Sequence, residues 1–149
     1  MIYYKILIWL TSAIAFNDDP IVSVRTETIT IGVKEEALVI LNVSVRNGYH
    51  ILSNDTGNDL IPTTVDIKDV QGVEILPAEF PEGSKFRLEG TDDFLHVYDG
   101  DFEIRIPIKA VTLEAGNYLL QGELRYQACD AKTCFFPRGV PFEVDLIII

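Results

Sequence analysis

The two cysteines of the chain, Cys129 and Cys134, are the residues whose type and spacing could do chemistry. They stand in the sequence Tyr126-Gln127-Ala128-Cys129-Asp130-Ala131-Lys132-Thr133-Cys134-Phe135-Phe136-Pro137, with four residues between them. Strand-like sequence lies on both sides, which places the pair in a turn at the mouth of a β-hairpin. Two thiols this close can form a local disulfide, which either holds a turn together or exchanges with other thiols.

Three kinds of site are compatible with such a pair. A structural disulfide that closes so small a loop would stabilise the fold by roughly 2 kcal/mol. A redox pair would instead cycle between dithiol and disulfide. Zinc is the weakest interpretation, because a structural zinc site needs a second pair of ligands, and His50 and His96 show no ligand spacing. Residue types alone leave the structural and the redox interpretations open.

The neighbours of the cysteines do not say which sulfur would attack. Asp130 disfavours a thiolate at Cys129, whereas Lys132 favours one, and the two effects oppose each other. The aromatic residues nearby allow two interpretations as well. These residues are Tyr126, Phe135 and Phe136. They could shield a reactive sulfur from oxidants, or they could be ordinary core packing.

The elements that must position the cysteines read as short β-strands. Apolar residues recur at every second position along residues 37–45, 102–108 and 140–149, and turn signals such as Asn47-Gly48 and Asp99-Gly100 separate the strand-like stretches. About eight or nine strands with turns roughly every 8 to 12 residues predict an all-β fold, best matched by an immunoglobulin-like antiparallel β-sandwich. The usual immunoglobulin disulfide joins cysteines far apart in sequence, so the present pair cannot be that disulfide.

Two details of the strand pattern can be checked in the structure. Residues 21–31 alternate and read as one strand-like stretch. The final Ile147-Ile148-Ile149 would form an exposed apolar edge if it were unpaired, so we expect it to lie inside a sheet.

The N-terminus reads as a signal peptide covering residues 1–15, followed by one domain over residues 16–149. An apolar run from Ile6 to Ile14 follows Lys5, and Ala13-Ile14-Ala15 fits a small-residue cleavage site. The alternative is a first strand, although Asn17-Asp18-Asp19-Pro20 would end it at once. Export would place the domain in an oxidising compartment, where a disulfide can persist.

The charge of the chain limits its partners. The 149 residues carry a formal net charge of −11 at pH 7. Nucleic acids and anionic membranes have the same sign, so the balance argues against both as partners.

The cysteine turn and several upstream segments resemble one protein family. Tyr126-Gln127-Ala128-Cys129-Asp130, followed by Cys134 and Pro137, resembles the active-site turn of the N-terminal periplasmic domain of the thiol:disulfide interchange protein DsbD. Four further segments are similar to that family's pattern in the same order, and they are Gly48-Tyr49-His50-Ile51-Leu52-Ser53-Asn54, Leu60-Ile61-Pro62-Thr63, Phe80-Pro81 and Val97-Tyr98-Asp99-Gly100.

The resemblance implies an immunoglobulin-like fold and a thiol–disulfide exchange activity that needs no metal or organic cofactor. It implies Cys129 and Cys134 as the redox pair, with Cys134 forming mixed disulfides and Cys129 resolving them. It also implies a cap over the disulfide, for which Asp92, Asp93 and Phe94 are the candidates. An acidic turn entering a strand is the alternative for that segment. Tyr49 and His50 match a segment that borders the site in the family, for which a packed core tyrosine and a surface histidine are the alternatives. Tyr126 and Phe136 are the other candidates for the surround of the disulfide.

The resemblance also implies partners and a location. Family members work in the periplasm, taking electrons from a thioredoxin-like domain fed by a membrane-embedded portion and passing them to thioredoxin-fold proteins. The present sequence shows neither a membrane bundle nor a thioredoxin domain, so we expect a separate membrane-embedded reductase. The cysteines are also one residue closer than in enterobacterial members. A non-catalytic immunoglobulin-like binding module with a structural disulfide remains the alternative function.

Overall fold

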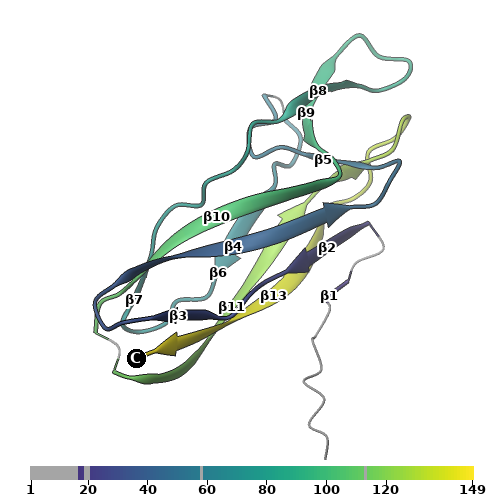
Figure 1. Cartoon of the computed structure of the whole chain (residues 1–149). Coiled ribbons are helices and arrows are strands. Elements are labelled where there is room, and N and C mark those ends of the chain that lie inside the picture. The colour runs from purple at the N-terminus through teal and green to yellow at the C-terminus, as the bar shows by residue number, and fades with distance from the viewer. Residues whose placement is uncertain (1–16, 19–20, 58, 113) are drawn as a thin grey trace, which may run out of the picture.

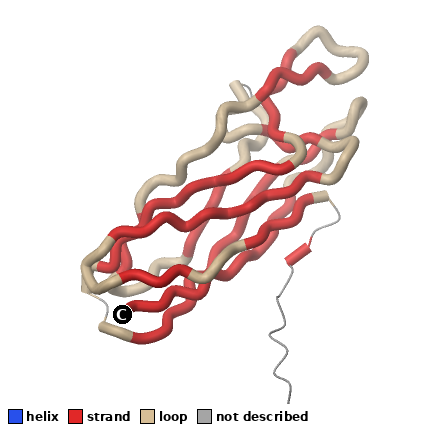
Figure 2. The backbone as a smooth tube through the Cα atoms, in the orientation of Figure 1, coloured by secondary structure: helices blue, strands red, loops and turns tan. Residues whose placement is uncertain are grey.

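The computed structural model describes residues 17–18, 21–57, 59–112 and 114–149, and this part of the chain is built from strands and turns (Figure 1, Figure 2). Within these ranges no helix is long and apolar enough to cross a membrane. The strands are β1 (Asn17–Asp18), β2 (Val22–Arg25), β3 (Ile29–Ile31), β4 (Glu36–Val45), β5 (His50–Leu52), β6 (Thr64–Ile67), β7 (Val73–Ile75), β8 (Ser84–Arg87), β9 (Phe94–Tyr98), β10 (Asp101–Ala110), β11 (Gly116–Tyr126), β12 (Ala128–Cys129) and β13 (Arg138–Ile148). The signal peptide predicted for residues 1–15 lies outside the described residues.

Two sheets form the body of the molecule. One has the strand order β1-β2-β4-β10-β7, and the other has the order β3-β13-β11-β6. The strands run lengthwise through the body in Figure 1. All strand pairs are antiparallel except β13 with β3. This arrangement confirms the predicted all-β, immunoglobulin-like sandwich.

The alternating residues predicted to be apolar on one face do form the core. Along β4, Val39, Leu41 and Val43 are buried. Along β13 every second residue from Val140 to Ile148 is buried, whereas the residues between them are exposed or half-buried. Because β13 lies between β3 and β11, its apolar end is paired on both sides, which confirms the expectation for Ile147 and Ile148. The expectation is wrong for Ile149, which follows the strand and is 73% exposed.

The stretch read as one strand over residues 21–31 is divided between the two sheets. β2 pairs with β4 in the first sheet, whereas β3 pairs with β13 in the second. The hydroxyl of Thr26 donates a 2.6 Å hydrogen bond to the backbone oxygen of Glu143, which fastens the crossing segment to β13. Residues 26–28 connect β2 to β3, and the chain crosses from the first sheet to the second over these residues.

A third, smaller sheet with the order β12-β5-β9-β8 extends from one end of the sandwich. One of its faces joins the main core through Ile51, Tyr98 and Ala128. The other face carries a separate apolar cluster of Leu52, Leu95, Val97 and Cys129. Figure 1 shows the β8–β9 hairpin projecting beyond the ends of the two larger sheets. The third sheet therefore ties the cysteine turn to this hairpin.

Candidate active site

Cys129 and Cys134 form a disulfide across a tight hairpin. Cys129 ends β12, the chain turns through residues 130–133, and Cys134 returns directly opposite Cys129 as an antiparallel bridge. The two sulfur atoms are 2.01 Å apart, and the Cα atoms are 3.9 Å apart. The backbone N–H of Phe135 donates to the carbonyl oxygen of Ala128 at 2.7 Å, which extends the pairing past the disulfide. The pair thus lies at the hairpin position predicted from the flanking strands.

Asp130 organises the turn between the cysteines. Its carboxylate accepts hydrogen bonds from the backbone N–H groups of Lys132 and Thr133 at 2.8 and 2.7 Å. Its own N–H donates to the carbonyl oxygen of Thr133 at 2.9 Å. The two bonds to the carboxylate stabilise its charged form and lower the pKa of Asp130 below its ordinary value. The Asp130 side chain therefore stabilises the turn between the two cysteines.

The two cysteines differ in their access to solvent. Cys129 is 0% exposed and packs with Leu52, Leu95 and Val97. Cys134 is half-buried at the edge of the same cluster. A thiol or disulfide arriving from outside can therefore approach Cys134 more readily than Cys129.

The β8–β9 hairpin supplies a cover for the disulfide. Phe86 and Leu88 pack against the cluster that contains Cys129. The N–H of Glu89 donates a 2.9 Å hydrogen bond to the carbonyl oxygen of Ala131, which lies in the turn between the cysteines. We call residues 88–93 the cap loop, since this segment is bonded directly to the disulfide turn.

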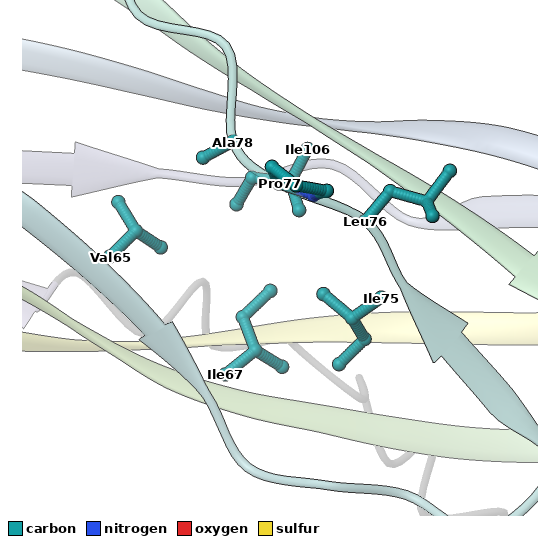
Figure 3. A pocket seen from close by; sticks show the side chains of 7 residues that line it. All are labelled: Val65, Ile67, Ile75, Leu76, Pro77, Ala78 and Ile106. Carbon is teal, nitrogen blue, oxygen red and sulfur yellow. The ribbon is translucent and has the colours of Figure 1, made fainter.

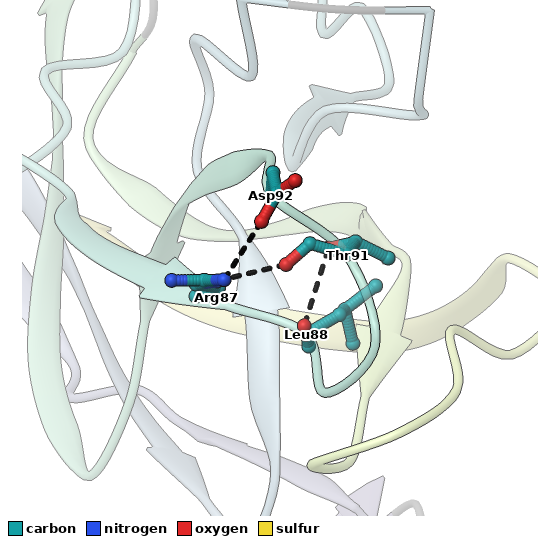
Figure 4. Close-up of polar contacts among 4 residues, drawn as sticks. All are labelled: Arg87, Leu88, Thr91 and Asp92. Atoms are coloured by element: carbon teal, nitrogen blue, oxygen red, sulfur yellow. Dashed lines mark hydrogen bonds and ion pairs between the residues drawn. The ribbon is translucent and has the colours of Figure 1, made fainter.

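Arg87 holds the cap loop in shape. Its guanidinium donates to the Thr91 carbonyl oxygen at 2.8 Å and to the Asp92 carboxylate at 2.9 Å (Figure 4). The N–H of Thr91 donates to the Leu88 carbonyl oxygen at 3.2 Å and closes the turn. Asp92 therefore lies at the exposed tip of the hairpin, paired with Arg87.

Phe94 is placed differently from what the resemblance suggested. It is 59% exposed and stands opposite Arg87 in the β8–β9 pairing, whereas Leu95 stands opposite Phe86. Opposite residues of an antiparallel pair share a face of the sheet, so Phe94 shares the face of Arg87. The opposite face, which covers Cys129, is built from Phe86, Leu88 and Leu95. Asp93 is exposed, and the cap role of Asp92, Asp93 and Phe94 stays a prediction.

The other predicted surround residues occupy three different environments. Tyr126 is fully buried in the main core. Tyr49 is half-buried, with its ring centroid 6.1 Å from that of Phe135. Phe136 is 90% exposed beside Cys134 and Phe135. Of these side chains, Phe136 is therefore the one available to a partner protein.

The sequence prediction did not include Gln127 in the site, but its side chain is hydrogen-bonded to the segment that follows the disulfide. Its side-chain amide donates to the Phe135 carbonyl oxygen at 3.0 Å and accepts from the Ile61 N–H at 3.0 Å. One side chain thus joins the loop before β6 to the return strand of the cysteine hairpin. The signal in the sequence was a polar residue between Tyr126 and Ala128, two residues that are often buried.

His50 lies in the segment that the resemblance placed at the border of the site, but the sequence prediction gave it no role there. It stands directly opposite Cys129 in the pairing of β5 with β12. Its ring is stacked on Phe86 with centroids 4.0 Å apart, and its Nε2 lies 3.7 Å from the Asp99 carboxylate. The alternation of His50 with Leu52 was the available signal, because residues two apart in a strand share a face.

A separate apolar pocket of about 280 Å³ lies between the edge strands β6 and β7 (Figure 3). Its lining side chains are Val65, Ile67, Ile75, Leu76, Pro77, Ala78 and Ile106. None of these belongs to the cluster around Cys129. Among the described residues, no group of three His, Cys, Asp or Glu side chains is arranged to hold a metal ion.

Comparison with known proteins gives one family match. The family model described as "Thiol:disulfide interchange protein DsbD, N-terminal" matches residues 19–146. No curated protein sequence matches the chain. The N-terminal periplasmic domain of ScsB from Proteus mirabilis has a similar structure, with a TM-score of 0.60 and 15% identity over 87% of this chain. The present chain spans 50% of the length of that chain.

A second solved structure with a similar fold is the reduced DsbD N-terminal domain from Neisseria meningitidis. Its TM-score is 0.48 and its identity is 15%, over 70% of this chain and 74% of that one. At this level of identity, the likeness to the ScsB domain concerns the fold.

Proposed function

We propose that this chain, which belongs to the family of DsbD N-terminal domains, passes electrons through Cys129 and Cys134 to thioredoxin-fold partner proteins. The family supports thiol–disulfide interchange in general. The observation that carries the specific proposal is the asymmetry of the disulfide, with Cys129 fully buried and Cys134 half-buried at the molecular surface.

The proposed reaction consists of two thiol–disulfide exchanges. In the reduced protein, the Cys134 thiolate attacks a partner disulfide and forms a mixed disulfide, releasing one partner sulfur as a thiolate. The Cys129 thiolate then attacks the Cys134 sulfur, re-forms the Cys129–Cys134 disulfide and releases the second partner sulfur. Two electrons pass to the partner, and a separate donor must reduce the disulfide again. Thiolates alone carry both steps, so no metal or organic cofactor takes part.

Phe136 is proposed as a contact residue for the partner. It is 90% exposed and lies two residues after Cys134, the cysteine proposed to attack the partner disulfide. Exposed aromatic side chains are frequent anchors of protein interfaces, because they bury a large apolar surface. A thioredoxin-fold protein that brings its disulfide to Cys134 would cover this ring.

Electron transfer to a purified partner tests the proposal. The reduced wild-type protein should convert oxidised thioredoxin to its dithiol form in a single turnover, and the Cys129→Ala and Cys134→Ala variants should each fail to do so. The fold can be checked in both variants by near-ultraviolet circular dichroism. If the wild-type protein transfers no electrons, or if neither substitution changes the rate, the proposed role of the pair is wrong.

The reduction potential distinguishes the proposal from a structural disulfide in a non-catalytic binding module. Structural disulfides of secreted proteins have potentials below about −300 mV, whereas exchange proteins have potentials between about −120 and −270 mV. We expect the Cys129–Cys134 pair in the second range.

We further propose that residues 1–15 direct export and that residues 16–149 act in the periplasm, supplied by a separate membrane-embedded reductase. The periplasmic description of the structurally similar ScsB domain supports this location. The acidic net charge supports protein partners and disfavours nucleic acid. N-terminal sequencing of the protein recovered from a periplasmic extract should begin at residue 16, and an intact N-terminus would contradict the proposal.

A further inference from the structure

We infer that His50 accepts the proton of the Cys129 thiol in the reduced protein, and thereby supplies the thiolate that resolves the mixed disulfide. This inference rests on the proposed function and adds a residue to its second step. It starts from the third sheet, where His50 and Cys129 are paired directly across neighbouring strands.

The strand register places the imidazole and the thiol on the same face. Residues directly opposite in an antiparallel pair have Cβ atoms about 4.5–5.5 Å apart and point to the same side. Ile51 and Ala128, the neighbouring pair, both face the main core. His50 and Cys129 must therefore face the opposite side, where Leu52 and Cys129 form the outer cluster.

Stacking fixes the imidazole ring at this position. The His50 ring lies 4.0 Å from the Phe86 ring, with an angle of 25° between the planes. Phe86 itself packs against the cluster that contains Cys129. Two independent contacts, the strand pairing and the stack on Phe86, therefore hold the imidazole beside the buried cysteine.

The two ring nitrogens have different surroundings. Nε2 lies 3.7 Å from the carboxylate of Asp99, at the end of β9. A carboxylate on this side favours the tautomer with its proton on Nε2, which leaves Nδ1 as an acceptor. Nδ1 is buried, and among the described residues it has no hydrogen-bond partner in the disulfide form. A buried acceptor without a donor is costly, and a Cys129 thiol formed on reduction would be a donor on the same face.

Three groups are placed against this imidazole by contacts and strand pairings: Cys129 on β12, the Asp99 carboxylate just after β9, and the Phe86 ring on β8. The charged residues of β8, Lys85 and Arg87, alternate with Phe86 and so belong to its other face. The proton that His50 takes can therefore be assigned to the cysteine.

The step balances without any further reactant. The S–H bond of Cys129 breaks, Nδ1 of His50 gains the proton, and the Cys129 thiolate attacks the Cys134 sulfur of the mixed disulfide. The Cys129–Cys134 bond forms as the bond between Cys134 and the partner breaks. The departing partner thiolate takes up a proton, and His50 returns to its neutral form by losing one.

The aromatic disulfide DTNB can test this step without a protein partner. Attack by Cys134 on DTNB releases a first coloured thiolate, and displacement by Cys129 releases a second, so stopped-flow absorbance separates the two steps. The His50→Phe substitution keeps a ring that can stack on Phe86 but removes Nδ1. We expect the second phase to slow by about 100-fold or more at pH 7, as for loss of a proton acceptor, while the first phase stays within twofold of wild type.

Three controls make the result decisive. His96→Gln changes the other histidine of the chain, which is exposed on β9, and should leave both phases unchanged. The second phase of His50→Phe should recover at alkaline pH, where the Cys129 thiol ionises without help. Near-ultraviolet circular dichroism of the oxidised variant should match that of wild type.

An unchanged second phase would overturn the inference, and so would equal slowing of both phases, because that would indicate a general structural effect. The assay reads only the two cysteines and DTNB. A failure of electron transfer to thioredoxin would therefore reject the proposed function without rejecting the role of His50, and the two failures remain distinguishable.

Discussion

The backbone N–H of Glu89 donates a 2.9 Å hydrogen bond to the carbonyl oxygen of Ala131. This bond joins the cap loop to the turn between the cysteines, two segments more than 40 residues apart in the sequence. The cap loop covers one side of the apolar cluster around Cys129, and the third sheet forms the other side. Access to the disulfide should therefore depend on whether this bond is made.

Removing that donor should make the disulfide easier to reduce. Glu89→Pro deletes the N–H, whereas Glu89→Ala keeps it and removes only the exposed side chain. A backbone hydrogen bond contributes about 0.5–1.5 kcal/mol, which corresponds to a two- to tenfold change in the population of an open cap. We expect dithiothreitol to reduce the Glu89→Pro disulfide about two- to tenfold faster than wild type, measured by loss of the oxidised species on a mass spectrum. Equal rates for the proline and alanine variants would show that the bond does not control access.

The hydrogen bonds to Asp130 predict a pH dependence of the cysteine turn. Because the pKa of Asp130 is lowered in the folded protein from its ordinary value of 3.8, its charge favours the folded turn. This contribution is complete above that ordinary value and is lost as pH falls through the lowered pKa. The melting temperature of wild type should exceed that of Asp130→Ala at pH 7, and the difference should shrink as pH falls below about 3.8. A difference that stays constant from pH 7 to pH 2 would contradict this assignment.

Gln127 should contribute to stability through its two backbone contacts. Gln127→Ala leaves the Ile61 N–H and the Phe135 carbonyl without their partner, and we expect the free energy of unfolding to fall by about 1–3 kcal/mol. Gln121→Ala is the matched control, since its amide only reaches the exposed Glu143 side chain at 3.3 Å. Urea unfolding measures both, and a Gln127 effect no larger than the Gln121 effect would contradict the prediction.

Gly122 is required where β11 crosses the ring of Phe142. A methyl group at Gly122 would clash with Cζ of Phe142 and would lie 2.7 Å from the backbone oxygen of Asp66. We expect Gly122→Ala to lower the free energy of unfolding by about 1–3 kcal/mol, the usual cost of overpacking. At Gly139 an added methyl group meets only atoms of the flexible Glu123 side chain. Gly139→Ala should therefore be much less destabilising, and urea unfolding that ranks the two variants in the opposite order would refute this account.

The main sandwich could be predicted from the sequence because apolar residues recur at every second position of its long strands. In β4, β10 and β13 every second residue is apolar, and the sequence pattern and the burial pattern coincide. The division of residues 21–31 between two sheets could not be predicted in this way. Alternation assigns a residue to a face, but it does not say which strand lies beside it, and Thr26 and Glu143 are far apart in the sequence.

The candidate site shows the same limit. The sequence identified the cysteine hairpin, since turn residues and strand flanks are local signals. It did not identify Phe86 and Leu88 as cover for Cys129, because that depends on the register of β8 with β9. Phe94 falls on the face of Arg87 through that same register. The position of His50 opposite Cys129 was not predicted, because it comes from a pairing between segments almost 80 residues apart.

Trapping a mixed disulfide tests the central claim most directly. Reduced Cys129→Ala and reduced Cys134→Ala proteins are each mixed with a thioredoxin variant that keeps one active-site cysteine, activated as a mixed disulfide with thionitrobenzoate, and the products are quenched with acid and weighed by intact-mass spectrometry. The account predicts that Cys129→Ala accumulates a covalent complex with thioredoxin through Cys134, because no thiol on either protein is left to resolve it. The Cys134→Ala protein, which retains only the buried Cys129, should accumulate little or none. The absence of a complex in both variants, or a complex formed only through Cys129, would contradict the account.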